Sequence, residues 1–167
     1  GDSTGGVAEC IISGLPAGIG EPVFDKLDAN IAKAVMSIGA VKGVEFGNGF
    51  LSAGLLGSEN NDPFFAEPGG GIKKAANSSG GILGGISDGD TVIFRAAVKP
   101  TPSISIPQKT VSKDGENTEI TITGRHDPVI VPRIVPVIEA MAAITTADLL
   151  LENMASEINR IKGFYGL

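Results

Sequence analysis

Residues 7–46 read VAECIISGLPAGIGEPVFDKLDANIAKAVMSIGAVKGVEF, and this stretch predicts the core of the fold. Val7 to Ser13 is apolar and β-branched around one acidic residue, which is typical of a strand. Val41 to Phe46 has the same character and predicts a second strand. Between them lies a helical pattern, so the order is strand, helix, strand.

The helical pattern begins near Pro22, a residue type favoured at the first position of a helix. Apolar residues recur at a spacing of three to four with charged residues between them, at Phe24, Leu27, Ile31, Val35 and Ile38. We expect an amphipathic helix that Gly39 stops. Such a unit is either a β-α-β element or part of an α+β layer, and the sequence does not fix which strands pair.

The rest of the chain adds further elements to the same domain. An irregular stretch rich in Gly, Asn and Pro covers residues 47–85, and Thr91 to Val98 predicts a strong strand. Residues 103–111 are expected to be extended and residues 118–123 to form a strand. A long helix follows Pro132, with Pro136 tolerated in its first turn. We predict a single α+β domain over residues 1–167.

Composition excludes several functional classes. The chain has 167 residues and a net charge of −6, which argues against a general affinity for nucleic acid or for an anionic membrane. No apolar run approaches the length of a membrane span, and Cys10 has no partner for an internal disulfide. These features predict a cytoplasmic protein. The chain does not begin with Met, which suggests a piece of a longer protein.

Arg125, His126 and Asp127 stand together between a predicted strand and the long helix. One reading is a site with a fixed cation and a carboxylate that accepts a proton. The other is a turn in which Asp127 caps the next segment and pairs with Arg125. One histidine and one cysteine give no metal-ligand set, so no metal site is expected.

Two further segments have two readings each. Lys99-Pro100-Thr101-Pro102-Ser103 follows a strand and either cradles a phosphate or a ring edge, or simply ends the strand. The paired glycines at 80–81 and 84–85 match no nucleotide-binding fingerprint. They suit the close approach of a flat ligand or tight packing.

Taken together and in order, the motifs resemble those of the chorismate synthase family. The resemblance runs nearly from end to end and rests on residues 14–29 (GLPAGIGEPVFDKLDA), 34–43 (AVMSIGAVKG), 77–87 (NSSGGILGGIS), 99–101 (KPT), 124–128 (GRHDP) and 131–136 (VPRIVP).

The resemblance implies a fold, an activity and partners. The fold would be the C-terminal part of a β-α-β sandwich, and the complete protein a homotetramer. The activity would be the anti-1,4 elimination of phosphate from 5-enolpyruvylshikimate 3-phosphate, giving chorismate in the last common step of aromatic amino-acid biosynthesis. Reduced FMN would be required, although the reaction has no net redox change.

The resemblance also implies site residues. Asp127 would assist proton movement at the flavin ring. Flavin contacts would fall on Gly39, Ala40, Gly84, Lys99, Pro100, Thr101, Pro102, Ser103 and Arg125. Pro102 stands where the family more often has Ser, which removes a hydroxyl and an N–H donor from the loop.

Family members are about twice as long, and their catalytic histidines lie in the N-terminal half, which is absent here. We therefore expect the 167-residue chain alone to be inactive. Two alternatives remain: a truncated relative that binds flavin or self-associates without catalysis, and an unrelated structural domain.

Overall fold

A three-stranded antiparallel sheet forms the centre of the computed structural model, which describes residues 1–167. Its strands are β1 (Gly6–Ile12), β7 (Val92–Val98) and β2 (Val41–Phe46), in the order β1-β7-β2. Both outer strands pair antiparallel with β7. The strand-helix-strand unit is therefore split, because β7 lies between the two strands that the helix connects.

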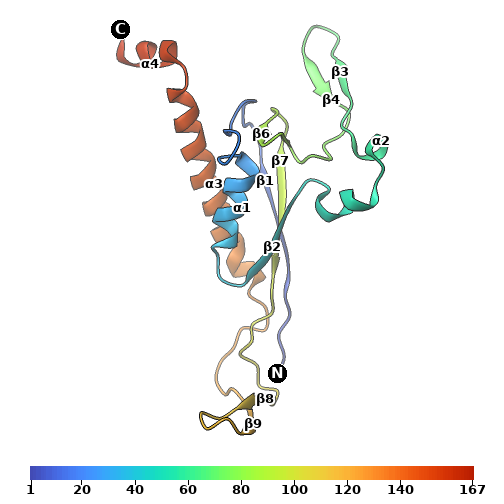
Figure 1. The fold of residues 1–167 in the computed structure, drawn as a ribbon, viewed down its shortest axis with the longest axis vertical. Coiled ribbons are helices and arrows are strands. Elements are labelled where there is room, and N and C mark those ends of the chain that lie inside the picture. The colour runs from blue at the N-terminus through green and yellow to red at the C-terminus, as the bar shows by residue number, and fades with distance from the viewer.

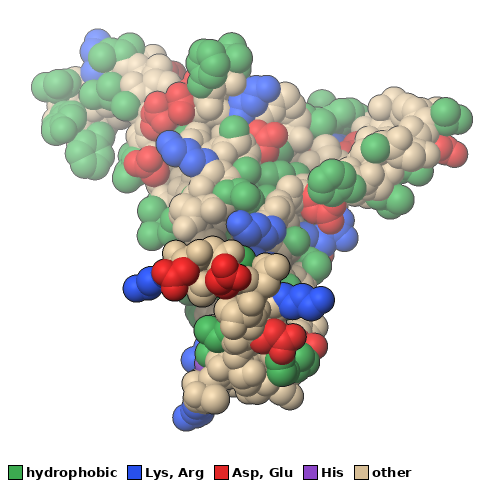
Figure 2. Space-filling model, turned by 60° about the horizontal axis from the view of Figure 1, so that its bottom comes forward, with side chains coloured by type: hydrophobic (Ala, Val, Ile, Leu, Met, Phe, Trp, Pro, Cys, Tyr) green, Lys and Arg blue, Asp and Glu red, His purple; other side chains and the backbone are tan.

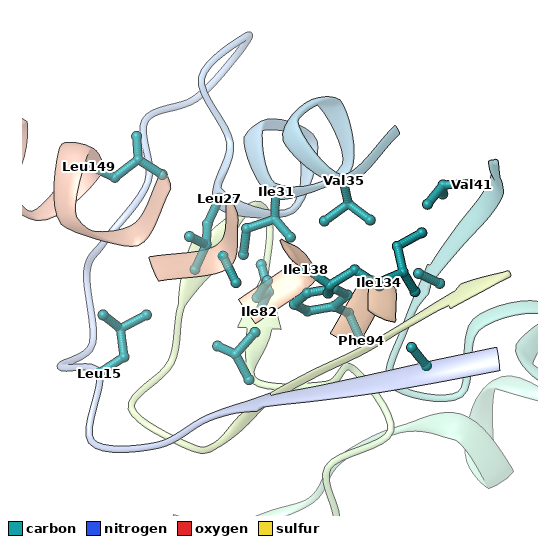
Figure 3. Close-up of a cluster of buried hydrophobic side chains, with 14 of the residues drawn as sticks. Leu15, Leu27, Ile31, Val35, Val41, Ile82, Phe94, Ile134, Ile138 and Leu149 are labelled. Atoms are coloured by element: carbon teal, nitrogen blue, oxygen red, sulfur yellow. The ribbon is translucent and has the colours of Figure 1, made fainter. Parts of the chain in front are cut away.

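Helices α1 (Leu27–Met36) and α3 (Val131–Ala155) pack side by side over one face of this sheet (Figure 1). Alternate residues of β7 point into the space between sheet and helices, and Phe94 is fully buried there. Figure 3 shows Ile31, Ile138 and Phe94 converging from α1, α3 and β7. The α+β prediction is confirmed.

The segment expected to be irregular contains short elements. Residues 47–87 hold two small hairpins and two short helices, which the sequence patterns did not reveal. The remaining elements of the chain are η1 (Gly49–Gly54), α2 (Gly57–Asn60), β3 (Phe64–Ala66), β4 (Ile72–Lys74), β5 (Ile82–Leu83), β6 (Ile86–Ser87), β8 (Gln108–Val111), β9 (Asn117–Ile120) and α4 (Ile158–Tyr165).

Helix α1 is shorter than its apolar pattern predicted. The Glu21 amide donates to the Asp25 carbonyl oxygen, which closes a turn before the helix, and Lys26 is the N-cap. Phe24 is exposed in that turn rather than on the helix face. The helix also ends at Met36, before Gly39, and the residue with a positive φ is Ala40 (73°).

The C-terminal helical region also differs from expectation. Helix α3 begins at Val131, so Pro136 lies beyond its first turn and not within it. Pro136 cannot donate to the carbonyl oxygen four residues earlier, which removes one helical hydrogen bond. Helix α4 was not predicted, and it follows α3 almost directly.

Helix α3 is long and apolar enough to cross a membrane, contrary to the expectation that no segment would be. The core helices of soluble proteins share this length and composition. One side of α3 packs on α1 and β1. Its other side carries exposed apolar residues such as Ile144 and Leu151.

Two projections extend from the sheet-and-helix body and carry further apolar side chains. Figure 2 shows these side chains gathered at the upper left, where α4 lies, and at the upper right, where the β3–β4 hairpin lies. They include Phe164 and Tyr165 on α4, and Phe64 and Ile72 on the hairpin.

Phe94→Ala should lower the free energy of unfolding by about 3–5 kcal/mol, because it leaves a cavity at the centre of the core. Phe94 is 0% exposed, and its ring centroid lies 5.7 Å from that of Phe46. Urea denaturation measures the change. Phe50→Ala is the matched control, since Phe50 is 83% exposed and its loss should change stability by less than about 0.5 kcal/mol. Equal effects of the two changes would contradict this assignment of the core.

Candidate functional site

Three segments meet at the lower end of the molecule as drawn in Figure 1: residues 1–5, the segment after β7, and the segment before α3. Between them lies a cavity of about 240 Å³ with no hydrophobic lining residue. It is lined by Gly1, Asp2, Ser3, Ser103, Ser105, Gly124, His126, Asp127 and Pro128. The structure thus brings Ser103 and Asp127, both predicted site residues, to one polar cavity.

Residues 1–5, which we name the strap, connect the other two segments. The Ser3 hydroxyl donates to the Thr101 carbonyl oxygen at 2.6 Å, and the Thr4 amide donates to the Pro128 carbonyl oxygen at 2.8 Å. The Ser105 amide donates to the Gly1 carbonyl oxygen at 2.9 Å. The two predicted site segments are therefore held through the strap.

Asp127 is paired with Arg133 and not with Arg125. Its two carboxylate oxygens lie 3.0 and 2.9 Å from the two terminal guanidinium nitrogens of Arg133. The N-cap of α3 is Ile130, without a side-chain cap. The reading of this corner as a turn with an Asp127 cap and an Arg125 pair is wrong in both details. Arg125 is exposed and has no ion pair, which leaves its guanidinium available to an anion.

Two polar atoms in these segments are buried without a hydrogen-bond partner: Thr101 Oγ1 and His126 Nε2. Buried polar groups normally have a partner, so these two atoms are unusual. His126 lines the cavity, whereas Thr101 lies two residues before the lining residue Ser103. The hydroxyls of Ser3, Ser103 and Ser105 and the His126 imidazole line this cavity, and such groups suit the phosphate or hydroxyl groups of a ligand. No group of three or more His, Cys, Asp and Glu side chains is placed to hold a metal ion.

Ala40 lies next to the start of the 99–103 loop. The Lys99 amide donates to the Ala40 carbonyl oxygen at 2.9 Å, since β2 and β7 pair from this end. Gly39 is exposed beside it, with open space where a side chain would stand. Ala40, Lys99 and the rest of the loop therefore lie at the same end of the sheet.

Gly84 lies at the opposite end. It is in the β5–β6 turn, and the Leu27 amide at the start of α1 donates to the neighbouring Gly85 carbonyl oxygen at 2.8 Å. The length of β7, roughly 20 Å for its seven residues, separates this turn from Lys99. A ligand that touches both Gly84 and Lys99 would have to span that length or meet Gly84 of another copy.

The glycine-rich block is explained mainly by packing. A Cβ on Gly80 or Gly81 would overlap backbone atoms of Gly47 or Thr91, so both positions require glycine. Gly84 differs, because nothing lies within 4 Å of its missing Cβ. Among these glycines, Gly84 is the one whose open side is free for a ligand.

A buried ion network centred on Lys74 fixes this block. The Lys74 side chain is 3% exposed, and its Nζ lies 2.6 Å from Asp88, 3.3 Å from Asp90 and 3.5 Å from Asp62. It also donates to Asn77 Oδ1 at 3.1 Å and to the Ser79 hydroxyl at 3.2 Å. Lys74 therefore ties the β3–β4 hairpin to the segments on both sides of the β5–β6 turn.

Asp62 stays ionised inside this network. Burial would raise the pKa of its carboxyl group, but hydrogen bonds from the Ser79 amide, the Ser79 hydroxyl and the Ser78 amide lower it far below the ordinary value of 3.8. A pKa depressed on folding contributes stability above the unfolded value and loses it as the pH falls toward the folded value. The contribution of Asp62 is therefore lost only below about pH 4.

Sequence reasoning missed several residues of these sites. Ser3 and Arg133 were not singled out for the site at the lower end, and Lys74 was not singled out at all. Arg133 carried a usable signal, because the helix dipole disfavours a cation in the first turn of a helix, and a nearby carboxylate offsets this. Ser3 and Lys74 carried none, because their partners lie far away in the sequence or in a segment without a periodic pattern.

Comparisons with known proteins give consistent findings. The family model described as chorismate synthase matches residues 1–151. The chain is 65% identical over 164 residues to the chorismate synthase of Lachnoclostridium phytofermentans, covering 98% of the chain and 45% of that protein. It is 61% identical over 154 residues to the chorismate synthase of Methanosarcina barkeri, covering 92% of the chain and 42% of that protein.

A solved structure described as a crystal structure of chorismate synthase aligns over 99% of the chain and 43% of its own length. The TM-score is 0.75, at 34% sequence identity. The chain thus spans a little under half the length of the relatives that it matches.

Lys74→Met should lower the free energy of unfolding by about 3–5 kcal/mol, because it leaves buried carboxylates without their cation. Lys73→Met is the matched control: its partner Glu67 lies 2.7 Å away, but Lys73 is 60% exposed, and its loss should leave stability nearly unchanged. Urea denaturation of both variants measures the two changes in the free energy of unfolding. A Lys74→Met variant as stable as the wild type would show that the network contributes little.

Proposed function

The chain belongs to the chorismate synthase family, and on this premise we propose that the complete protein is a chorismate synthase that requires reduced FMN. It would eliminate phosphate from 5-enolpyruvylshikimate 3-phosphate to give chorismate. The single observation that carries the proposal is the polar cavity where the Lys99–Ser103 loop meets the Arg125–Asp127 corner. The chain spans less than half of its relatives, so the proposal concerns the complete protein.

The residues at the lower end would hold the polar part of FMN. His126 and Ser103 line the cavity, and neither Thr101 Oγ1 nor His126 Nε2 has a hydrogen-bond partner within the chain. The guanidinium of Arg125 would meet its phosphate or that of the substrate. Ala40 would contribute backbone contacts beside Lys99, with Gly39, Pro100 and Pro102 adjacent. Reduced FMN, when bound, would supply the electron-rich ring on which this elimination depends.

Asp127 would hold or move a proton at the ring. Arg133 occupies one acceptor position on each of its carboxylate oxygens. A carboxylate has further lone pairs, so Asp127 can still accept a proton while Arg133 fixes its orientation. The pair thus supplies a proton acceptor in a defined place, as general base catalysis needs. Gly84 remains a proposed flavin contact. Within one copy of the chain it lies at the opposite end of β7 from the other proposed contacts.

We also propose that the complete protein is a cytoplasmic homotetramer acting on a small phosphorylated substrate. The exposed apolar residues of the β3–β4 hairpin, α4 and the outer side of α3 support assembly, because large exposed apolar areas usually mark interfaces. The sheet also leaves β1 and β2 each with one unpaired edge.

The direct test compares three proteins supplied with 5-enolpyruvylshikimate 3-phosphate and reduced FMN. The complete protein should release chorismate and phosphate in equal amounts. The 167-residue chain alone should release neither, because it holds only part of the site. The complete Asp127→Asn variant should bind FMN but turn over about 10²–10⁴-fold more slowly, as expected for a missing general base.

Each result has a defined meaning. Turnover by the isolated chain would contradict the claim that the chain holds only part of the site. FMN binding without turnover by the complete protein would favour the non-catalytic relative. If the complete protein showed neither FMN binding nor turnover, the remaining alternative would be a structural domain. Full activity of the Asp127→Asn variant would show that Asp127 takes no part in the mechanism.

A further inference from the structure

The loop from Lys99 to Ser103 has few means of being held in place. Pro100 and Pro102 have no N–H, so their backbone cannot donate a hydrogen bond. The loop is instead anchored through its carbonyl oxygens. Thr101 accepts from the Ser3 hydroxyl at 2.6 Å, and Pro102 accepts from Gln108 Nε2 at 3.3 Å.

The Ser3 bond is the shorter of the two anchors, and its donor is itself fixed to the other wall of the cavity. The next residue, Thr4, donates its amide to the Pro128 carbonyl oxygen at 2.8 Å. Ser3 lines the cavity together with Asp127 and Ser103. The Ser3 hydroxyl is therefore the contact of the strap with the middle of the proline loop, and the Ser105–Gly1 bond joins the strap to the residues after that loop.

We propose that Ser3 is a positioning residue for the ligand of this cavity: its hydroxyl fixes the Thr101 carbonyl, and thereby places Ser103, which lines the cavity two residues later. The inference rests on the proposed binding of FMN at this end of the chain. Ser3 acts through the loop and takes no part in the chemistry. Without its hydroxyl, the loop keeps its backbone bond at Lys99 but loses its central anchor.

The loss should weaken ligand binding more than it weakens the fold. A single hydrogen bond at a half-exposed position has a small effect on folding. A ligand that needs the loop in one place must then order the loop when it binds, which raises its Kd. We expect about a three- to tenfold higher Kd for FMN, the factor that corresponds to one such bond.

The experiment uses the complete protein with Ser3→Ala. It measures the Kd of FMN by flavin fluorescence, the melting temperature, and amide exchange of the loop and its flanks without FMN, where the Lys99 and Ser105 amides are hydrogen-bonded. Ser3→Thr keeps a hydroxyl and should restore binding. Ser156→Ala is the matched control, because the Ser156 hydroxyl donates to the Asn153 carbonyl oxygen at the same 2.6 Å, at the far end of α3. It should leave both the Kd and the loop exchange unchanged.

The expected result is a raised Kd and faster exchange confined to the loop in Ser3→Ala, with the melting temperature within about 2 °C of the wild type. Unchanged Kd and loop exchange would overturn the proposal, and so would faster exchange throughout the sheet. If the wild type itself binds no FMN, the proposed function fails. The loop exchange without FMN still decides whether Ser3 holds the loop.

Discussion

The pairing of β7 between β1 and β2 is the constraint on which the rest of the structure depends. A strand, a helix and a second strand follow one another in the chain, but the two strands never meet, since β7 separates them. The apolar side of β7, centred on Phe94, needs both helices to cover it. Helix α1 arrives with its two flanking strands, whereas α3 comes from the end of the chain.

The same pairing builds the site. In the β1–β7 register Gly6 stands opposite Val98, so the residues before β1 run beside the residues after β7. The strap therefore lies against the Lys99–Ser103 loop as a direct result of strand pairing. Helix α3 packs on β1, with Val131 against Gly6, and this contact brings the Asp127 corner to the same end. The β5–β6 turn with Gly84 lies at the other end of β7 for the same geometric reason.

Residues 7–46 and 92–98 could be predicted from the sequence because their apolar spacing reports local structure directly. The insertion of β7 could not, because strand pairing depends on contacts between distant segments: Phe46 stands opposite Phe94, and Gly6 opposite Val98. Phe24 fitted the helical period, but a preceding turn removed it from the helix. Asp127, Ser103 and the rest of the candidate site were proposed from family motifs, and the structure tests only where they lie. No sequence pattern predicted the Asp127–Arg133 pair, the Ser3 anchor or the Lys74 network, because each depends on how side chains meet in the folded chain.

Strand pairing brings the strap, the proline loop and the Asp127 corner together, and we propose that all three serve one ligand. Amide hydrogen exchange of the complete protein, with and without FMN, tests this proposal. Residues 99–105 and 124–127 should gain protection together, at one FMN concentration midpoint. Protection of only one of these segments, or protection confined to other parts of the chain, would contradict it.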